Sequence, residues 1–459
     1  MELLLYKPQK ILLINPANKK IHNSFPHLGL AMLSAMLKEA GHLPLILDYL
    51  IFPMVPSIDS FMEQFKPDVV GVSIFSASLS GAVKVVEMVK KYYVPIIIGG
   101  PHTSIYAEDL MTLGVDYIVK GEAEFAVVQI VENASKQQAP RIIRVSPPNN
   151  LDELPLPDFK SFYNYKEITS YPLLTSRGCP YNCSFCCVSQ VSSRKWRPRN
   201  VYLCVDELQH AVKYLPKLKN IEVMDDNPTF DIIHFKKFIK AYIQSDLPNK
   251  IKEFAIANIR ADKIDEELIT LLKEVGVKHI AIGVEHGDEE VFDFIGKRET
   301  LANIKLAARL IKSSGIKLGC CFIIGLPKDG MEKTMKSIKL AKELNADYYF
   351  WNLLAPYKGT KVRGWFEKNG KILREANEPL IFSGTLDSIC PEPYACSNNF
   401  SVSEIQRAFL LAMLETDQYK VRIFKGPLWL LKMVKLVVKH HVFGFFMKSM
   451  WRQIEQRGR

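Results

Sequence analysis

Short apolar runs alternate with amphipathic stretches over most of this chain, and this alternation limits its fold more than any other feature. The runs at 10–16, 43–49 and 94–100 each have a stretch of consecutive Ile or Leu at their centre. Helix-like stretches separate them, such as 28–41, which ends at Gly41. Strands that are apolar on both faces and joined through helices form covered parallel sheets. The pattern therefore predicts an α/β protein.

The alternation falls into two parts with different expected architectures. Residues 1–140 contain five expected strands and predict a Rossmann-like or flavodoxin-like domain. Residues 141–170 are Pro-rich ("SPPNNLDELPLPDF") and indicate a linker. Residues 171–375 repeat strand–helix units and predict a partial (β/α) barrel of the TIM type. Residues 376–459 leave this pattern and predict a mainly helical C-terminal region.

Three cysteines in the segment "RGCPYNCSFC" carry the strongest chemical signal. Cys179, Cys183 and Cys186 follow an expected strand at 171–174, on a loop rich in turn-forming residues. Barrels of this kind place their active sites at the carboxyl ends of their strands. Three thiolates on one loop would leave one iron of a [4Fe–4S] cube without a protein ligand. The spacing thus favours a catalytic cluster.

A zinc site or a set of buried free thiols is the alternative for these cysteines. Zinc takes four ligands, often from a second C-x2-C pair. Cys204 is followed three residues later by Glu207, so no second pair exists. A Cys3His site with His210 stays open. Cys187, which adjoins the motif, is expected to be a bystander.

At these residues the chain resembles the radical S-adenosylmethionine (SAM) enzymes. "CPYNCSFC" matches their C-x3-C-x2-C motif, with the aromatic Phe185 before the third cysteine. The resemblance implies that SAM chelates the open iron and is cleaved to methionine and a 5′-deoxyadenosyl radical. It also implies SAM contacts from Phe185 and from polar residues at later strand ends, here Asp225, Arg260 and Glu285. Each of the polar residues could instead cap a helix or pair with a neighbour.

Two stretches depart from that family's usual pattern. The family usually has a serine where this chain has His286, and "GLPGET" where this chain has "GLPKDG" at 325–330. His286 could donate a proton, although a single histidine at a strand end is more often hydrogen-bonded and structural. Cys320 and Cys321 lie within an expected strand and should be small buried apolar residues.

The front region resembles the cobalamin-binding domain that precedes many radical SAM enzymes. The matching stretches are "FPHLGLAMLSAMLKEAGH", "PDVVGVSIFSAS", "GGPHTS" and "DYIVKGEAE". Seven residues near the expected strand ends are the candidates for binding cobalamin: Ser73, Ser76, Gly99, Gly100, His102, Gly121 and Glu122. The chain lacks the D-x-H-x-x-G motif whose histidine coordinates cobalt in other B12 proteins, and it lacks the G-x-G-x-x-G of dinucleotide sites. A degenerate domain that binds nothing is the alternative.

Positive charge is concentrated at the C-terminus. The chain has a net charge of +11, and ten Lys or Arg with one acid lie within the last 40 residues. Gly426 and Pro427 open an expected helix on which Lys432, Lys435 and Lys439 share one face. Apolar residues cover much of the rest: Trp429, Leu430, Met433, Leu436, Val437, Phe443, Phe445, Phe446, Met450 and Trp451. This pattern is typical of a helix in a membrane interface, and a helix packed on the barrel or in a dimer is the alternative.

The remaining composition bears on location. Nine cysteines, an odd and unevenly spaced set, indicate thiols in a reducing cytoplasm. The N-terminus has neither the cationic lead nor the cleavage site of a signal peptide, and no apolar run reaches about 18 residues. No nucleic-acid module is recognisable. We therefore expect a cytoplasmic protein without nucleic-acid partners, peripheral at most on the inner face of the membrane.

The two resemblances together imply an enzyme with three cofactors: a [4Fe–4S] cluster, SAM and cobalamin. The implied reaction is methylation of an unactivated carbon, in which a substrate radical takes the methyl group of methylcobalamin and a second SAM restores it. The implied partners are a small-molecule or lipid-like substrate and an electron donor such as a flavodoxin or ferredoxin. A radical cyclisation or rearrangement without methyl transfer is one alternative, and a non-catalytic metal-binding protein is another.

Overall fold

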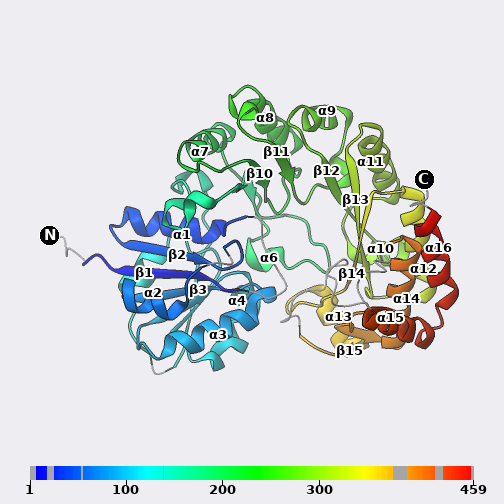
Figure 1. Ribbon diagram of the computed structural model, residues 1–459, viewed down its shortest axis with the longest axis horizontal. Coiled ribbons are helices and arrows are strands. Elements are labelled where there is room, and N and C mark those ends of the chain that lie inside the picture. The colour runs from blue at the N-terminus through cyan, green and yellow to red at the C-terminus, as the bar shows by residue number, and fades with distance from the viewer. Residues whose placement is uncertain are drawn as a thin grey trace.

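The computed structural model describes the backbone of residues 7–17, 25–52, 55–137, 139–375, 390–418 and 427–455. Side chains are described in the same ranges except at 427–432, 449 and 452–455. Figure 1 shows three parts: a front domain in blue, a partial barrel in green to yellow, and C-terminal helices in orange to red on the far side of the barrel.

Six parallel strands form the sheet of the front domain, in the order β2-β1-β3-β4-β5-β6. They are β1 (Lys10–Asn15), β2 (Leu43–Asp48), β3 (Val69–Ser73), β4 (Ile96–Gly99), β5 (Tyr117–Lys120) and β6 (Arg141–Arg144). The first five are the predicted strands, and β6 was not predicted. This is a flavodoxin-like order, whose switch point between β1 and β3 is where such sheets bind ligands.

Helices cover both faces of this sheet because successive residues of each strand point to opposite sides. Ile11 and Leu13 of β1 pack with α1 (Leu28–Glu39) and α5 (Val127–Glu132). Leu12 and Ile14 pack with α2 (Ile58–Phe65) and α3 (Leu79–Lys90) on the other face. The short helix α4 (Pro101–Tyr106) follows β4 directly.

The Pro-rich segment after β6 packs against both parts of the molecule. Phe159 and Phe162 are buried in one cluster with Tyr171 of the barrel, and the Phe159 and Tyr171 rings lie 4.9 Å apart. Phe162 also bridges to Ile46 of β2. The segment thus connects the two parts through apolar contacts.

Two three-stranded parallel sheets form the barrel, with orders β11-β10-β7 and β12-β13-β14. The strands are β7 (Ser170–Leu173), β10 (Asn220–Val223), β11 (Glu253–Ile256), β12 (His279–Glu285), β13 (Lys317–Ile324) and β14 (Tyr348–Leu353). An isolated bridge between Ile259 and Ile282 joins the two sheets. The outer helices are α7 (Val201–Tyr214), α8 (Ile232–Ile243), α9 (Glu266–Glu274), α11 (Leu301–Ser313) and α12 (Met331–Leu344). The predicted partial barrel is confirmed.

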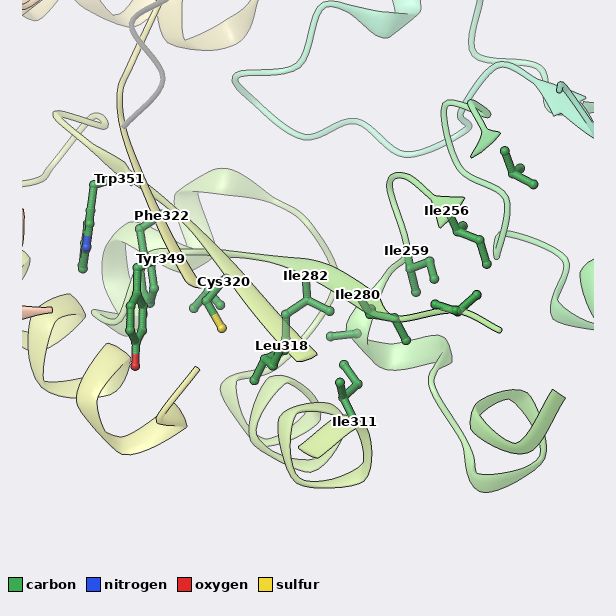
Figure 2. Close-up of a cluster of buried hydrophobic side chains, with 14 of the residues drawn as sticks. Ile256, Ile259, Ile280, Ile282, Ile311, Leu318, Cys320, Phe322, Tyr349 and Trp351 are labelled. Carbon is green, nitrogen blue, oxygen red and sulfur yellow. The ribbon is translucent and has the colours of Figure 1, made fainter. Parts of the chain in front are cut away.

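The barrel core lies between β12–β14 and the outer helices. Figure 2 shows Ile282, Leu318 and Ile311 gathered between the strands and α11. The Phe322 and Trp351 rings stack at 4.3 Å. Cys320 is fully buried here, as expected, whereas Cys321 is only partly buried.

Seven short elements lie around the cysteine motif, after β12 and after β14. They are β8 (Ser176–Arg177), α6 (Val188–Val191), β9 (Arg197–Pro198), α10 (Glu289–Ile295), α13 (Lys361–Asn369), β15 (Gly370–Ile372) and β16 (Ala395–Ser397). The C-terminal helices are α14 (Val402–Glu415), α15 (Pro427–Lys439) and α16 (Phe443–Glu455). The helix predicted from Pro427 is confirmed, and Gly426 lies outside the described residues. Within the described ranges, no helix is long and apolar enough to cross a membrane.

Candidate active site

The cysteine loop leaves the carboxyl end of β7 and is held there by Asp225. The buried Asp225 carboxylate accepts hydrogen bonds from Thr175 N at 2.7 Å, Thr175 Oγ1 at 2.7 Å and Ser176 Oγ at 2.5 Å. Burial raises the pKa of Asp225 to about 6, and the hydrogen bonds oppose that rise. Asp225, a predicted SAM contact, thus lies beneath the loop with both oxygens engaged.

The loop turns at Gly178, immediately before the first cysteine. Gly178 has a φ of +86°, and a Cβ there would lie 2.3 Å from the Lys195 carbonyl oxygen. Its N–H donates to Asp226 Oδ2 at 2.8 Å. Only glycine fits this turn without moving the backbone, so the residue fixes where the motif begins.

Cys179, Cys183 and Cys186 are half-buried and form no disulfide. Burial raises the pKa of the Cys183 thiol to about 11 and that of Cys186 to about 12. The buried Asn227 amide donates to Cys179 Sγ at 3.6 Å. Hydrogen bonds to ligand sulfurs tune iron–sulfur clusters, so the surroundings of the motif fit such a cluster.

The described side chains do not support a single-ion arrangement at the motif. Among them, no three His, Cys, Asp or Glu come together in a way that could hold one metal ion. His210 is exposed on α7, with its ring 5.2 Å from that of Tyr214. The three sulfurs are therefore not arranged around one zinc ion with His210.

Arg260 lies against the cysteine loop through an aromatic contact. Its guanidinium carbon is 3.8 Å from the centre of the Tyr181 ring, and Tyr181 lies between two cysteines of the motif. Arg260 Nε also donates to Asp262 Oδ1 at 2.9 Å. Arg260 is thus a positively charged support of the loop, and its predicted SAM contact stays a prediction.

Glu285 belongs to a buried group of charges that the sequence analysis missed. Lys297 Nζ lies 3.1 Å from Glu285 Oε1 and 3.1 Å from Glu299 Oε2. Glu285 ends β12 at an irregularity in strand pairing and has a φ of +64°. Burial raises the pKa of Glu299. Lys297 thereby fixes the direction in which the Glu285 carboxylate points.

A cavity of about 270 Å³, here called the barrel cavity, opens at the carboxyl ends of β12, β13 and β14. Phe185 and Glu285 line it, which brings two of the four predicted SAM residues together. Asp225 and Arg260 are not among its lining residues. Other lining residues are Ile323, Asn352, Leu354, Tyr357, Arg374 and Tyr394.

Residues that follow the last barrel strand complete one wall of the barrel cavity. Arg374 follows β15 and Tyr394 precedes β16, and the guanidinium carbon lies 4.0 Å from the centre of the Tyr394 ring. Arg374 Nη2 donates to the Glu392 carbonyl oxygen at 2.5 Å. No sequence motif contains these two residues, so they could not be predicted. The pairing of β15 with β16 places them at the cavity.

A larger cavity of about 630 Å³, here called the front cavity, lies between the front sheet and the barrel. Five of the seven predicted cobalamin residues line it: Ser73, Gly99, Gly100, Gly121 and Glu122. Leu174, Arg177 and Asp226 line it from the barrel side. Gly100 has a φ of +110°, and a Cβ there would lie 2.9 Å from the Ile74 carbonyl oxygen. The cavity therefore brings most of the predicted cobalamin residues to one site, and its volume lies in the range of ligand and cofactor sites.

His27 also lines the front cavity and was not predicted as a site residue. Its Nδ1 accepts from Leu30 N at 3.1 Å, as the N-cap of α1, and its Nε2 lies 2.7 Å from Ser73 Oγ. An accepting Nδ1 places the proton on Nε2, which then donates to Ser73. Burial lowers the pKa of His27 to about 4. A neutral histidine thus orients a predicted cobalamin residue.

Ser76 and His102 are not among the residues that line the front cavity. Ser76 Oγ lies 2.9 Å from His102 Nδ1, and the His102 ring stacks on Tyr106 at 4.7 Å. Ser76 is also hydrogen-bonded to the side chain of Tyr357, which lines the barrel cavity. The pair therefore connects the front domain to the barrel cavity, and its predicted contact with cobalamin stays a prediction.

Ion pairs join the two parts beside the cysteine loop. Arg177 Nη1 donates to Glu122 Oε2 at 3.0 Å and to Glu124 Oε1 at 2.5 Å. Arg197 Nη2 donates to Glu122 Oε1 at 2.5 Å. Glu124 Oε2 is buried and has no hydrogen-bond partner among the described residues. This oxygen could accept from an amide of a ligand in the front cavity, which Glu124 lines.

The two departures from the radical SAM pattern contact each other. His286 is fully buried, and its Nε2 lies 3.1 Å from Asp329 Oδ1 within "GLPKDG". Asp329 also accepts from Gly325 N and Gly330 N at 2.9 and 2.7 Å. These contacts support the interpretation of His286 as a hydrogen-bonded, structural residue and not as a proton donor.

Family models match both parts of the chain. The B12 binding domain matches residues 14–131, and the radical SAM superfamily matches residues 173–341. The chain is a radical SAM protein with a B12 binding domain. The first match contains most of the front-domain residues that line the front cavity, and the second contains the three cysteines. Both predicted resemblances are confirmed.

Relatives of this radical SAM protein extend the likeness over most of its length. An uncharacterized methyltransferase of Pyrococcus horikoshii is 29% identical over 401 residues, covering 80% of this chain and 85% of the relative. The anaerobic magnesium-protoporphyrin IX monomethyl ester cyclase of Rubrivivax gelatinosus is 27% identical over 389 residues, covering 76% and 68%. The methyltransferase TsrM of Kitasatospora setae, solved with cobalamin and a [4Fe–4S] cluster, superposes with a TM-score of 0.64 at 18% identity, covering 78% of this chain and 77% of TsrM. The last likeness shows the shared fold.

Proposed function

We propose that this protein is a cobalamin-dependent radical SAM methyltransferase that methylates an unactivated carbon. One observation carries the proposal: the cysteine loop and the helix after it border both cavities. Arg177 and Ser192 line the front cavity, and Phe185 lines the barrel cavity. Groups bound in the two cavities would thus be neighbours of one iron–sulfur loop, as a transfer between them requires.

The chain's own residues have separate tasks in this proposal. A bound cluster with SAM would supply radical chemistry, and bound cobalamin would supply a methyl group. Cys179, Cys183 and Cys186 would hold the cluster. Glu285, fixed by Lys297, can accept hydrogen bonds from hydroxyl groups in the barrel cavity. Apolar residues of both cavities exclude water.

Two of these relatives support this proposal, and a third supports its main alternative. The Pyrococcus relative is named a methyltransferase, and TsrM is a radical SAM methyltransferase. The Rubrivivax relative is a cyclase. A radical cyclisation without methyl transfer is therefore the second candidate.

We also propose the partners and location of the enzyme. The substrate would be a small or lipophilic molecule, and a flavodoxin or ferredoxin would donate electrons. All nine cysteines are unpaired, which suits a reducing cytoplasm. The C-terminal helices would bring the enzyme to the inner face of the membrane.

Labelled SAM separates the two candidate reactions. The purified protein, reconstituted without oxygen with iron, sulfide and cobalamin, is incubated with extract of its own cells and SAM carrying a deuterated methyl group. We expect mass spectrometry to find a product with the deuterated methyl group and 5′-deoxyadenosine beside it. Formation of 5′-deoxyadenosine together with an unlabelled, rearranged product would contradict methyl transfer and support the cyclase.

A further inference from the structure

The outer faces of α15 and α16 carry an unusual surface. Five exposed apolar side chains form what we call the C-terminal apolar surface: Val438, Phe443, Phe445, Met447 and Trp451. Large apolar side chains that are exposed singly are ordinary on protein surfaces. Five within fourteen residues exceed such scatter, so this surface is a candidate for contact with an apolar layer.

The opposite faces of the same helices are already used for packing. Met433, Val437, Val442 and Phe446 are buried and belong to the main core cluster. Helix α16 contacts α14, which ties it to the barrel (Figure 1). The helices therefore pack on the core through these four side chains, and the C-terminal apolar surface is separate from that packing face.

Three of the four exposed apolar residues of α16 form a row along the helix, and the fourth, Phe445, lies outside that row. Phe443, Met447 and Trp451 are spaced four residues apart, so they lie one above the other on the helix. Their exposed fractions are 49%, 41% and 63%. A row of this kind can enter an apolar layer along its whole length while the helix axis stays parallel to the layer.

Positive charge accompanies the row. Residues 427–455 contain five Lys or Arg and one acid, Glu455. Lys435 and Lys439 are exposed on α15, and Lys448 is exposed on α16. Each basic residue near an anionic lipid surface contributes about 1 kcal/mol of attraction. The charge therefore favours a negatively charged partner.

We propose that the C-terminal apolar surface docks the protein on an anionic lipid bilayer, with α15 and α16 lying in the interface. Each of these helices has 13 residues, too few for the roughly 20 that span a bilayer. A second copy of the chain is a less suitable occupant, because a twofold interface would bring the same lysines together. This inference extends the proposed location and does not depend on methyl transfer.

Vesicle flotation tests the proposal with the full-length protein and no SAM. The probes are vesicles of phosphatidylcholine alone and of phosphatidylcholine mixed with phosphatidylglycerol. We expect binding to the mixed vesicles, weakened by salt. A variant with Phe443→Ser, Met447→Ser and Trp451→Ser should bind at least about ten-fold more weakly. A variant with Lys435→Gln, Lys439→Gln and Lys448→Gln should bind about a hundred-fold more weakly.

Matched controls keep the result interpretable. Tyr93→Ser with Ile233→Ser removes side chains that are 83% and 78% exposed elsewhere, and vesicle binding should not change. Unaltered melting temperatures of the serine and glutamine variants would show that the fold is intact. Equal binding to neutral and anionic vesicles, or full binding by the triple serine variant, would overturn the proposal. A dimer in solution that the serine variant dissociates, without vesicle binding, would assign the surface to a second copy instead.

Discussion

The side chain of Asn227 reaches a cysteine sulfur of the motif. Its amide donates to Cys179 Sγ, and a donor to a ligand sulfur stabilises the extra negative charge of a reduced cluster. We expect Asn227→Leu to lower the cluster's reduction potential by about 40 mV, the equivalent of roughly 1 kcal/mol for one electron. An EPR-monitored redox titration measures this. Asn220→Leu is the control, because Asn220 donates to Ser170 at the other end of β10; equal potentials in both variants would contradict the assignment.

His102 predicts a pH dependence of stability. Burial lowers its pKa from 6.5 to about 4, so between these values the unfolded chain binds a proton that the folded protein does not. The unfolding free energy must then fall as the pH decreases through this window. We expect His102→Gln to lose less stability between pH 7 and pH 5 than the parent protein, by on the order of 1 kcal/mol. Urea unfolding at both pH values tests this, and parallel losses would contradict it.

Individual site residues were predictable only where a motif or a strand end marked them. Phe185 stands inside the cysteine motif, and Glu285 ends an apolar strand, so both could be named from the sequence. Lys297 and Tyr357 lie in segments without such signals. They join the site through contacts with Glu285 and Ser76, which are distant in sequence. Such contacts are set by tertiary packing and leave no local pattern.

At the scale of elements, Glu122 joins the end of β5 to the cysteine loop. Its carboxylate pairs with Arg177 and Arg197, whose side chains are 12% and 2% exposed. Removing one partner of a buried pair leaves uncompensated charge. We expect Glu122→Ala to lower the unfolding free energy by about 3–5 kcal/mol, measured by denaturant unfolding. Glu108→Ala is the matched control, since Glu108 is exposed and its pairs with Lys120 and Arg144 should contribute less than about 1 kcal/mol.

The order of the helices and strands could be predicted more completely than the residues at which they begin and end. Short apolar runs bounded by Pro and Gly, such as 94–100, favour strands of a sheet covered by helices, and from them the parallel sheets could be predicted. Strand β6 was missed because its sequence, "RIIR", has two apolar residues between charges and follows a Pro-rich context. It forms because the open edge of β5 pairs with it over four residues. An edge strand such as β6 forms because a neighbouring strand pairs with it. The local sequence does not show that pairing.

At the scale of the whole molecule, the front cavity lies between two parts that share one buried apolar cluster. A ligand that binds only the folded protein stabilises it by mass action. We expect cobalamin at a hundred times its Kd to raise the unfolding free energy by about 2.7 kcal/mol, seen as a higher Tm. Gly100→Ala should abolish this increase, because a Cβ there meets the Ile74 carbonyl oxygen. Gly41→Ala, with a positive φ but open space around it, should retain it. An unchanged Tm of the parent protein with cobalamin would favour a degenerate front domain.

The proposed chemistry depends on an iron–sulfur cluster held by three thiolates. EPR of the reduced protein, reconstituted without oxygen, with and without SAM, tests it most directly. We expect a [4Fe–4S] signal that changes when SAM is added, together with 5′-deoxyadenosine. Both should vanish in Cys183→Ala and persist in Cys187→Ala. A signal indifferent to SAM, or 5′-deoxyadenosine produced by Cys183→Ala, would contradict the account.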